Sequence, residues 1–217
     1  RTNAQSRIFE EYLRRYNIPY KSFGRTSFYQ SKEVKDLTGY LRLAVNTPDE
    51  EALKRVINFQ GRGIGQTTID RLVVAANETG KTIFGLLKEI NTITININNG
   101  TKNKLKDFVT LIESYQVLNQ TANAFDLAEH VTKTSGLIRE FNKDGTPEGV
   151  MRLENVEELL NGIKDFVEGQ LEIADSKDDL AEFLEDVALA TDLDGDKGDP
   201  NHVALMTIHS SKGLEFN

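Results

Sequence analysis

Four long segments of the chain share a hydrophobic spacing that constrains the fold more than any other feature of the sequence. In each segment the apolar residues recur every three or four positions, which places them on one face of an α-helix. The segments are residues 105–118, 124–137, 150–171 and 180–190. Amphipathic helices bury their apolar faces against one another, so we predict an all-helical body in which the Leu and aromatic residues form a core rather than a cofactor site. His130 lies within this pattern and is expected to be structural.

The two ends of the chain follow a different pattern. Residues 18–23 alternate like a short strand, and the run 203–208 is apolar and β-branched, with the length of a buried strand. A polar loop with His209, Lys212 and Gly213 follows the second run. In open α/β sheets ligands bind beyond the carboxyl ends of the strands, so this loop is a candidate site. The alternative is an ordinary strand followed by a surface turn.

A glycine-rich turn, Gly61-Arg-Gly-Ile-Gly65, lies between two predicted short helices. The first helix follows the capping signal Thr47-Pro-Asp-Glu50, and the second has helical spacing from Ile69 to Ala76. This arrangement predicts a helix-hairpin-helix. Glycine can take positive φ and lets backbone N–H groups approach a phosphate closely, so Gly63, Ile64 and Gly65 are candidate contacts to duplex DNA.

Three cations near this turn are candidates for neutralising the phosphate charge. They are Lys54, Arg62 and Arg71. Contacts of this kind position a duplex without reading its sequence. The alternative is a tight turn in which glycine only permits close packing of the two helices.

Two further segments carry patterns that only partly match a strand or a metal site. Residues 91–99 alternate Asn or Thr with Ile, which favours a strand by its period and a loop by its asparagine content. Asp192, Asp194 and Asp196 match the first, third and fifth positions of a calcium loop, but Lys197 and Val203 stand where glycine and a bidentate glutamate are required. We therefore expect a solvated acidic linker here, and no bound metal.

The net charge of −8 over 217 residues conceals a division along the chain. Residues 1–112 carry 18 Lys and Arg against 11 Asp and Glu, whereas residues 113–217 carry 8 against 23. A polyanion would be attracted to the first half and repelled by the second, unless the asymmetry is a chance property of solvated faces. With no cysteine and no apolar run near the roughly 20 residues that span a bilayer, we expect a cytoplasmic protein without membrane contact.

Several stretches resemble one family. The segment Met206-Thr-Ile-His-Ser-Ser-Lys-Gly-Leu-Glu-Phe216 is similar to motif V of the UvrD, Rep and PcrA group of superfamily 1 DNA helicases. The opening Arg1-Thr-Asn-Ala-Gln-Ser-Arg7 resembles a second block of that family. Phe28-Tyr29, Glu33-Val-Lys-Asp36 and the glycine turn follow in the family's order, so the resemblance covers the whole chain. Ser211 departs from the alanine that is commoner in motif V, and residues 91–99 depart from the family pattern.

The resemblance implies a fold and a domain division. The fold class is mainly α: a helical accessory domain, called 2B in the family, that contains the helix-hairpin-helix and is flanked by partial α/β, RecA-like segments. Residues 1–24 and 199–217 would belong to the second RecA-like motor domain, and residues 25–198 to the accessory domain.

The resemblance also implies roles for single residues. The parent helicase would use ATP and Mg²⁺ to move along DNA at a junction of single strand and duplex. Lys212, Gly213 and Glu215 would lie by the ATP cleft, and Arg1, Asn3 and His209 would contact the single strand.

Other motifs are missing from the sequence. It contains no phosphate-binding loop of the type Gly-x-x-x-x-Gly-Lys-(Ser/Thr) and no acidic magnesium motif after a strand, so we expect this chain alone to bind no cofactor and to hydrolyse no ATP. It would contribute to the activity only together with the remaining motor domains of its parent. Two alternatives stay open: a helicase-like subunit of a recombination helicase-nuclease, and a non-enzymatic helix-hairpin-helix module that binds DNA.

Overall fold

The fold is mainly helical, as the hydrophobic spacing predicts. The computed structural model describes residues 8–10, 12–13, 16, 18–23, 28–143, 145–171, 180–195, 202–206 and 211–212. The helices are α2 (Lys32–Val45), α3 (Glu50–Val56), α4 (Gln66–Thr79), α5 (Ile83–Lys88), α6 (Asn99–Asn119), α7 (Ala124–Thr134), α8 (Leu137–Lys143), α9 (Pro147–Leu171) and α10 (Leu180–Gly195). Two 3-10 turns, η1 (Phe28–Gln30) and η2 (Phe59–Gly61), and two strands, β1 (Tyr20–Phe23) and β2 (Val203–Met206), complete the described elements.

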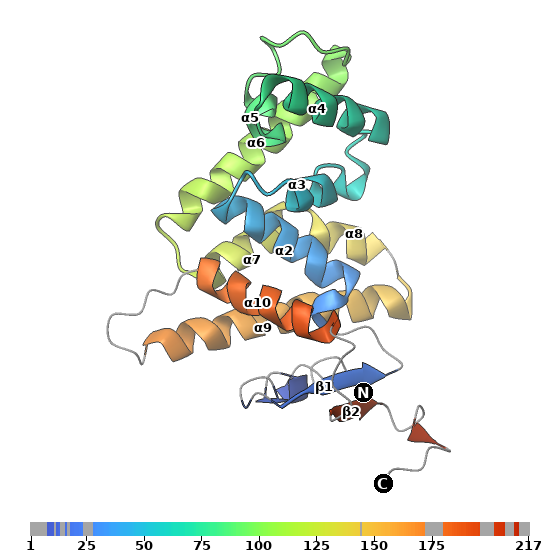
Figure 1. Cartoon of the computed structure of the whole chain (residues 1–217), viewed down its shortest axis with the longest axis vertical. Coiled ribbons are helices and arrows are strands. Elements are labelled where there is room, and N and C mark those ends of the chain that lie inside the picture. Colours follow the sequence, from blue (N-terminus) through green and yellow to red (C-terminus); the bar gives the residue numbers. More distant parts are fainter. Residues whose placement is uncertain are drawn as a thin grey trace.

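Helix α2 is the centre of the body. Its residues Leu37, Tyr40 and Leu41 are fully buried, and it packs against α3, α6, α7, α9 and α10 (Figure 1). A helix buried on most of its surface needs apolar residues on more than one face, and α2 has them at closely spaced positions such as Tyr40, Leu41 and Leu43. The other helices therefore take their places around this one.

Helix α6 connects the two ends of the body. It begins beside α4 and α5 at the end of the molecule farthest from the sheet, and it runs down toward α7 (Figure 1). Its buried residues Leu105, Phe108, Ile112 and Tyr115 recur every three or four positions along one face. The first half of α6 thus belongs to the region of the glycine turn and its second half to the main core.

Two strands, one near each end of the sequence, meet in a small parallel sheet below the helical body (Figure 1). Strands β1 and β2 pair in parallel, with Tyr20 opposite Val203 and Phe23 opposite Met206. The strand at 203–206 is confirmed, but the expectation that it is buried is wrong: Val203 is 41% exposed. Within the described residues the sheet has two strands only, so β2 has no second strand neighbour there.

Several predicted boundaries shift for local reasons. The helical pattern of residues 124–137 is split into α7 and α8 because Gly136 takes φ +88°, in the left-handed region. Residues 91–98 form no strand; they are a loop that ends where the Asn98 side chain caps α6 by accepting from Thr101 N at 2.8 Å. Helix α10 continues to Gly195, so an acidic linker can begin only after that residue.

No helix within the described part of the chain has the length and apolar character needed to cross a bilayer.

Candidate nucleic-acid interface

The glycine turn between α3 and α4 has an unusual backbone. Gln60, Gly61 and Gly63 have φ values of 63°, 63° and 75°, all in the left-handed region. The Asn58 side chain holds the turn closed, since its Oδ1 accepts from Ile64 N at 3.0 Å. Ile64 is fully buried, whereas the glycines on either side of it are exposed. The isoleucine therefore anchors the turn and the glycine backbone faces solvent.

Gly65 differs from the other glycines of the turn. It is the N-cap of α4, with φ −71° and ψ 161°, a conformation that any residue can adopt. A Cβ atom at this position would have no other atom within 4 Å. Neither backbone strain nor crowding inside the chain therefore requires glycine here. The N–H groups of the first turn of α4 lie next to this open space and carry the positive end of the helix dipole.

The guanidinium of Arg62 points into the protein. It donates to Val56 O at 2.7 Å, to Tyr40 Oη at 2.8 Å and to Ser135 O at 3.5 Å. Its carbon Cζ also lies 5.7 Å from the centre of the Tyr40 ring and 5.5 Å from that of Phe108. The residue expected to reach a phosphate is thus engaged with α2, α3, α6 and the turn before α8 in this structure.

A second set of contacts docks the turn on the junction of α7 and α8. The Gln60 amide donates to Ser135 O at 3.0 Å and accepts from Arg139 at 3.2 Å. Gln60 also occupies the space that a side chain at Gly136 would need. The turn is therefore held from two sides, by Arg62 within the core and by Gln60 at its edge.

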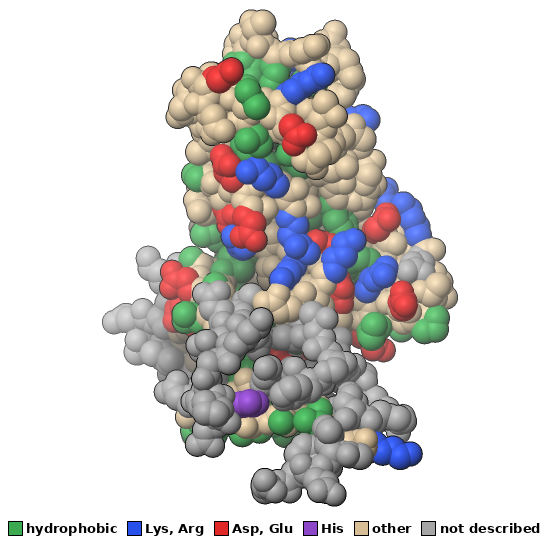
Figure 2. All heavy atoms as spheres, turned by 45° about the vertical axis from the view of Figure 1, so that its right-hand side comes forward, with side chains coloured by type: hydrophobic (Ala, Val, Ile, Leu, Met, Phe, Trp, Pro, Cys, Tyr) green, Lys and Arg blue, Asp and Glu red, His purple; other side chains and the backbone are tan. Residues whose placement is uncertain are grey.

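The other two predicted cations lie on the exposed surface with partners of their own. Lys54 Nζ is 3.1 Å from Glu50 Oε2, one helical turn away, and Arg71 donates to Asn96 O in the loop before α6. Figure 2 turns this side of the molecule toward the viewer and shows Lys and Arg interleaved with Asp and Glu on that face. The attraction for an anion at the turn thus depends on single cations rather than on a continuous basic patch.

Sequence reasoning missed one cation at this site, Lys104 of α6. Its Nζ lies against Gly63, in the place where a Cβ at that position would be. The sequence does show a cluster of lysines at positions 102, 104 and 106. Nothing in the spacing, however, indicates which of them faces a turn 40 residues earlier.

Of the residues expected at the ATP cleft and the single strand, the structure describes only Lys212. Lys212 is exposed and follows β2 in sequence. Arg1, Asn3, His209, Gly213 and Glu215 lie outside the described residues. Their roles at the ATP cleft and the single strand therefore stay predictions.

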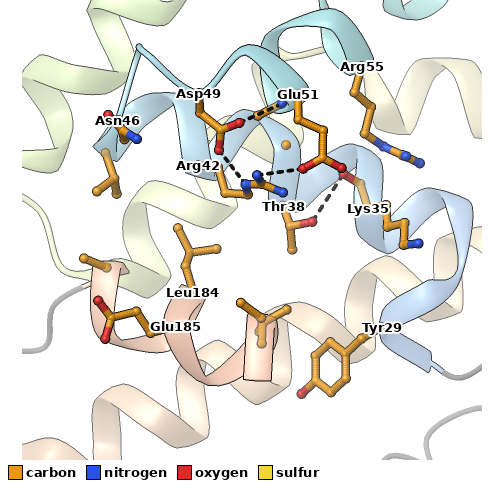
Figure 3. A pocket seen from close by; sticks show the side chains of 16 residues that line it. Tyr29, Lys35, Thr38, Arg42, Asn46, Asp49, Glu51, Arg55, Leu184 and Glu185 are labelled. Carbon is orange, nitrogen blue, oxygen red and sulfur yellow. Dashed lines mark hydrogen bonds and ion pairs between the residues drawn. The ribbon is translucent and has the colours of Figure 1, made fainter. Parts of the chain in front are cut away.

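A groove of about 570 Å³ lies between α2, α3 and α10 (Figure 3). Its α2–α3 wall is charged: Arg42 contacts Asp49 at 2.7 Å and Glu51 at 3.0 Å. Leu184 and Val187 of α10 contribute apolar surface to the opposite wall. The guanidiniums of the charged wall are already bound to carboxylates, so the groove presents a closed ion-pair network and not a reactive centre.

A buried ion pair lies at the edge of this groove. Arg55 Nε is 2.8 Å from Asp36 Oδ1, and the Asp36 side chain is 4% exposed. Burial raises the pKa of Asp36 above its usual 3.8, with Arg55 acting in the opposite direction. The described residues contain no group of three or more His, Cys, Asp or Glu side chains arranged to hold a metal ion.

The sequence of this helical body, with its glycine turn and the paired strands at its base, matches a known protein family. The chain belongs to the UvrD-like helicase C-terminal domain family, whose sequence profile matches residues 1–217. This confirms the resemblance to the UvrD and PcrA type of helicase at the level of the family.

Individual relatives extend the comparison. The chain is 35% identical over 217 residues to the ATP-dependent DNA helicase PcrA of Staphylococcus aureus, and 35% identical over 220 residues to that of Staphylococcus epidermidis. In both cases the match covers 100% of this chain and 29% of the relative. The chain thus spans less than a third of the length of these relatives.

Proposed function

We propose that this chain is part of an ATP-dependent DNA helicase of replication or repair, in which residues 25–198 form the accessory domain, called 2B, and hold duplex DNA. Residues 1–24 and 199–217 would belong to the second RecA-like motor domain. ATP and Mg²⁺ would bind in the complete protein, between its motor domains. The chain alone would be inactive as an ATPase, and the complete protein would act in the cytoplasm.

The observation that carries the proposal is the open space at Gly65. Asn, Asp or Ser at an N-cap stabilises a helix at least as well as glycine does, and the fold leaves room for any of them. A glycine at this position is useful when a molecule from outside must approach the backbone closely. A phosphate of duplex DNA fits this requirement, because the exposed N–H groups and the helix dipole favour an anion.

The turn would grip DNA without reading its sequence. Backbone N–H groups of Gly63 and Gly65 would bind phosphate, which is common to every base pair, while Ile64, whose N–H donates to Asn58 Oδ1, would anchor the turn between them. Lys54 and Arg71 would add attraction from the exposed surface, while Arg62 would hold the turn in place from within. Such a grip tolerates any DNA sequence, which suits a helicase that moves along its substrate.

The base of the molecule would meet the motor domains. Ile8, Phe9, Tyr12 and Tyr16 are between 48% and 66% exposed, and they lie at the same end as the two-stranded sheet. Parallel sheets are normally covered on both faces, and two strands alone are marginal in water. Further strands and helices of the complete motor would supply that cover. Lys212, Gly213 and Glu215 would then reach the ATP cleft, and Arg1, Asn3 and His209 the single strand.

Gly65→Asp tests the proposal. Aspartate is a favourable N-cap, so the variant should unfold at the same or a higher denaturant concentration, yet its charge should repel a phosphate. We expect duplex binding, measured by fluorescence anisotropy with a tailed duplex at low salt, to weaken about tenfold or more, equivalent to about 1.4 kcal/mol.

Thr82→Asp is the matched control. Thr82 is the N-cap of α5 and lies beyond the far end of α4, about 20 Å along that helix from Gly65. It adds the same charge to a capping position, so its duplex affinity should stay near that of the unchanged chain. Equal affinities for Gly65→Asp and Thr82→Asp would contradict a role for the turn in binding DNA.

A further inference from the structure

Helix α6 contacts the glycine turn at two successive points. The Phe108 ring lies 5.5 Å from the Arg62 guanidinium, and Lys104, one helical turn earlier, reaches Gly63. Residues four apart lie on the same face of a helix. Arg62 and Gly63, which are adjacent in the glycine turn, therefore contact Phe108 and Lys104, which are one helical turn apart in α6. Burial of Leu105 and Phe108 fixes the rotation of α6, and this places Lys104 at the turn.

The ammonium of Lys104 takes the place of a missing side chain. At Gly63 an added Cβ would collide with Lys104 Nζ and would lie 3.6 Å from its Cε. The positive φ of Gly63 already disfavours other residues there. Glycine at 63 therefore serves two purposes, since it permits the backbone turn and it lets a cation lie directly against that backbone.

Lys104 lacks the acceptor that the other cations against the glycine turn have, as do Lys102 and Lys106 of the same helix within the described residues, but only Lys104 lies against the turn. Lys54 is paired with Glu50, Arg71 with Asn96 O, Arg139 with Gln60 and Arg62 with three acceptors. Within the described part of the chain, Lys104 forms neither a salt bridge nor a hydrogen bond. An exposed ammonium held in place by its helix and left without a carboxylate is suited to an anion from outside.

On the basis of the proposed function, we infer that Lys104 binds a backbone phosphate of the duplex together with the turn. The ammonium supplies the charge from α6, and Gly63 and Gly65 supply N–H donors from the glycine turn, while the N–H of Ile64 stays bound to Asn58 Oδ1. The grip is thus assembled from two elements that are far apart in sequence. Lys104, rather than Arg62, is the principal cation of this site.

The test uses Lys104→Gln in the full 217-residue chain, with Lys102→Gln as the matched control on the same helix. Duplex affinity is measured by anisotropy over a series of salt concentrations, with two unrelated duplex sequences. For Lys104→Gln we expect about fivefold weaker binding with both sequences and a slope of log K against log salt that is smaller by about one. Lys102→Gln should change affinity by less than twofold, and Lys104→Arg should retain most of the binding.

The outcomes separate this inference from the proposal on which it rests. If Gly65→Asp abolishes duplex binding but Lys104→Gln leaves affinity and salt slope unchanged, the turn binds DNA and the role of Lys104 is refuted. A change in the unfolding midpoint of Lys104→Gln without a change in salt slope would equally refute it, because Lys104 would then only fill space. If the unchanged chain binds no duplex at low salt, both ideas fail.

Discussion

At the scale of single residues, the sequence shows which cations are near the glycine turn, but it does not show in which direction their side chains point. An arginine between two glycines in an exposed turn is a reasonable candidate for a phosphate contact, yet Arg62 finds three acceptors inside the protein. Its planar group offers five donors, and Tyr40 and Ser135 accept from it only because α2 and the α7–α8 junction come together. Lys104 shows the reverse case, since its position at Gly63 depends on how α6 is rotated.

Arg62→Lys should destabilise the fold. A lysine ammonium cannot match the spread of the three acceptors, so we expect a loss of about 1–3 kcal/mol in the free energy of unfolding, measured with urea. Lys54→Gln, which removes an exposed ion pair, should cost less than about 1 kcal/mol. An Arg62→Lys chain as stable as the original would show that the inward contacts contribute nothing.

Asp36 should make stability depend on pH. Because burial raises its pKa above 3.8 in the folded state, the folded chain holds this proton more tightly than the unfolded chain. Asp36 therefore adds most to the free energy of unfolding at a pH below its pKa in the unfolded chain. This stabilisation is lost as the pH rises from about 4 through the raised pKa of Asp36 in the folded chain.

Asp36→Asn removes this titration and provides the reference. Unfolding of both chains with urea between pH 3.5 and 7.5 should show the stability of the original chain, relative to Asp36→Asn, falling as the pH rises. The charged and titratable groups around Asp36 are Arg55, Lys32, Glu33 and Tyr40. A relative stability that increases with pH would mean that the attraction of Arg55 outweighs burial.

At the scale of elements, the helices were largely predictable and their junctions were not. Hydrophobic spacing located α6, α9 and α10 because each buries one continuous face. The same spacing runs through Gly136 without a break, so only the backbone reveals that α7 ends there. The apolar run 203–206 has the composition of a buried strand, and its exposure depends on the surrounding structure, which a local pattern does not encode.

Gly136→Ala should loosen the docking of the glycine turn. The backbone at this position has φ +88°, and Gln60 fills the space that a Cβ would need. We expect a loss of about 1–3 kcal/mol, seen as a melting temperature lower by several degrees. Gly145→Ala is the control, because a Cβ there has no atom within 4 Å, and it should melt within about 1 °C of the original. Similar melting temperatures for the two variants would contradict the docking role.

At the scale of the whole molecule, the described core belongs to the helices between the two ends. Every buried hydrophobic side chain of the described structure lies between Phe28 and Val187. The sheet, by contrast, exposes Val203 and is composed of strands from both ends of the sequence. The sequence predicted both strands, but their parallel pairing and register required the fold.

A shortened chain of residues 28–195 should therefore fold by itself. We expect a cooperative thermal transition by circular dichroism, with most of the helical signal retained, and salt-sensitive duplex binding within about threefold of the 217-residue chain. A non-cooperative transition or a loss of duplex binding would show that the strands at the base are needed to hold the helices together.

The pairing of β1 with β2 also bears on the order in which the chain folds. Phe23 and Met206 are partners although nearly the whole chain lies between them. Closing a disordered loop of that length costs roughly 5 kcal/mol of chain entropy, more than four pairs of strand residues can offset. Helices with local contacts form quickly, and once they have packed they hold both strands at the same end of the body. Strand β2 therefore finds its partner β1 after the helices between them are in place.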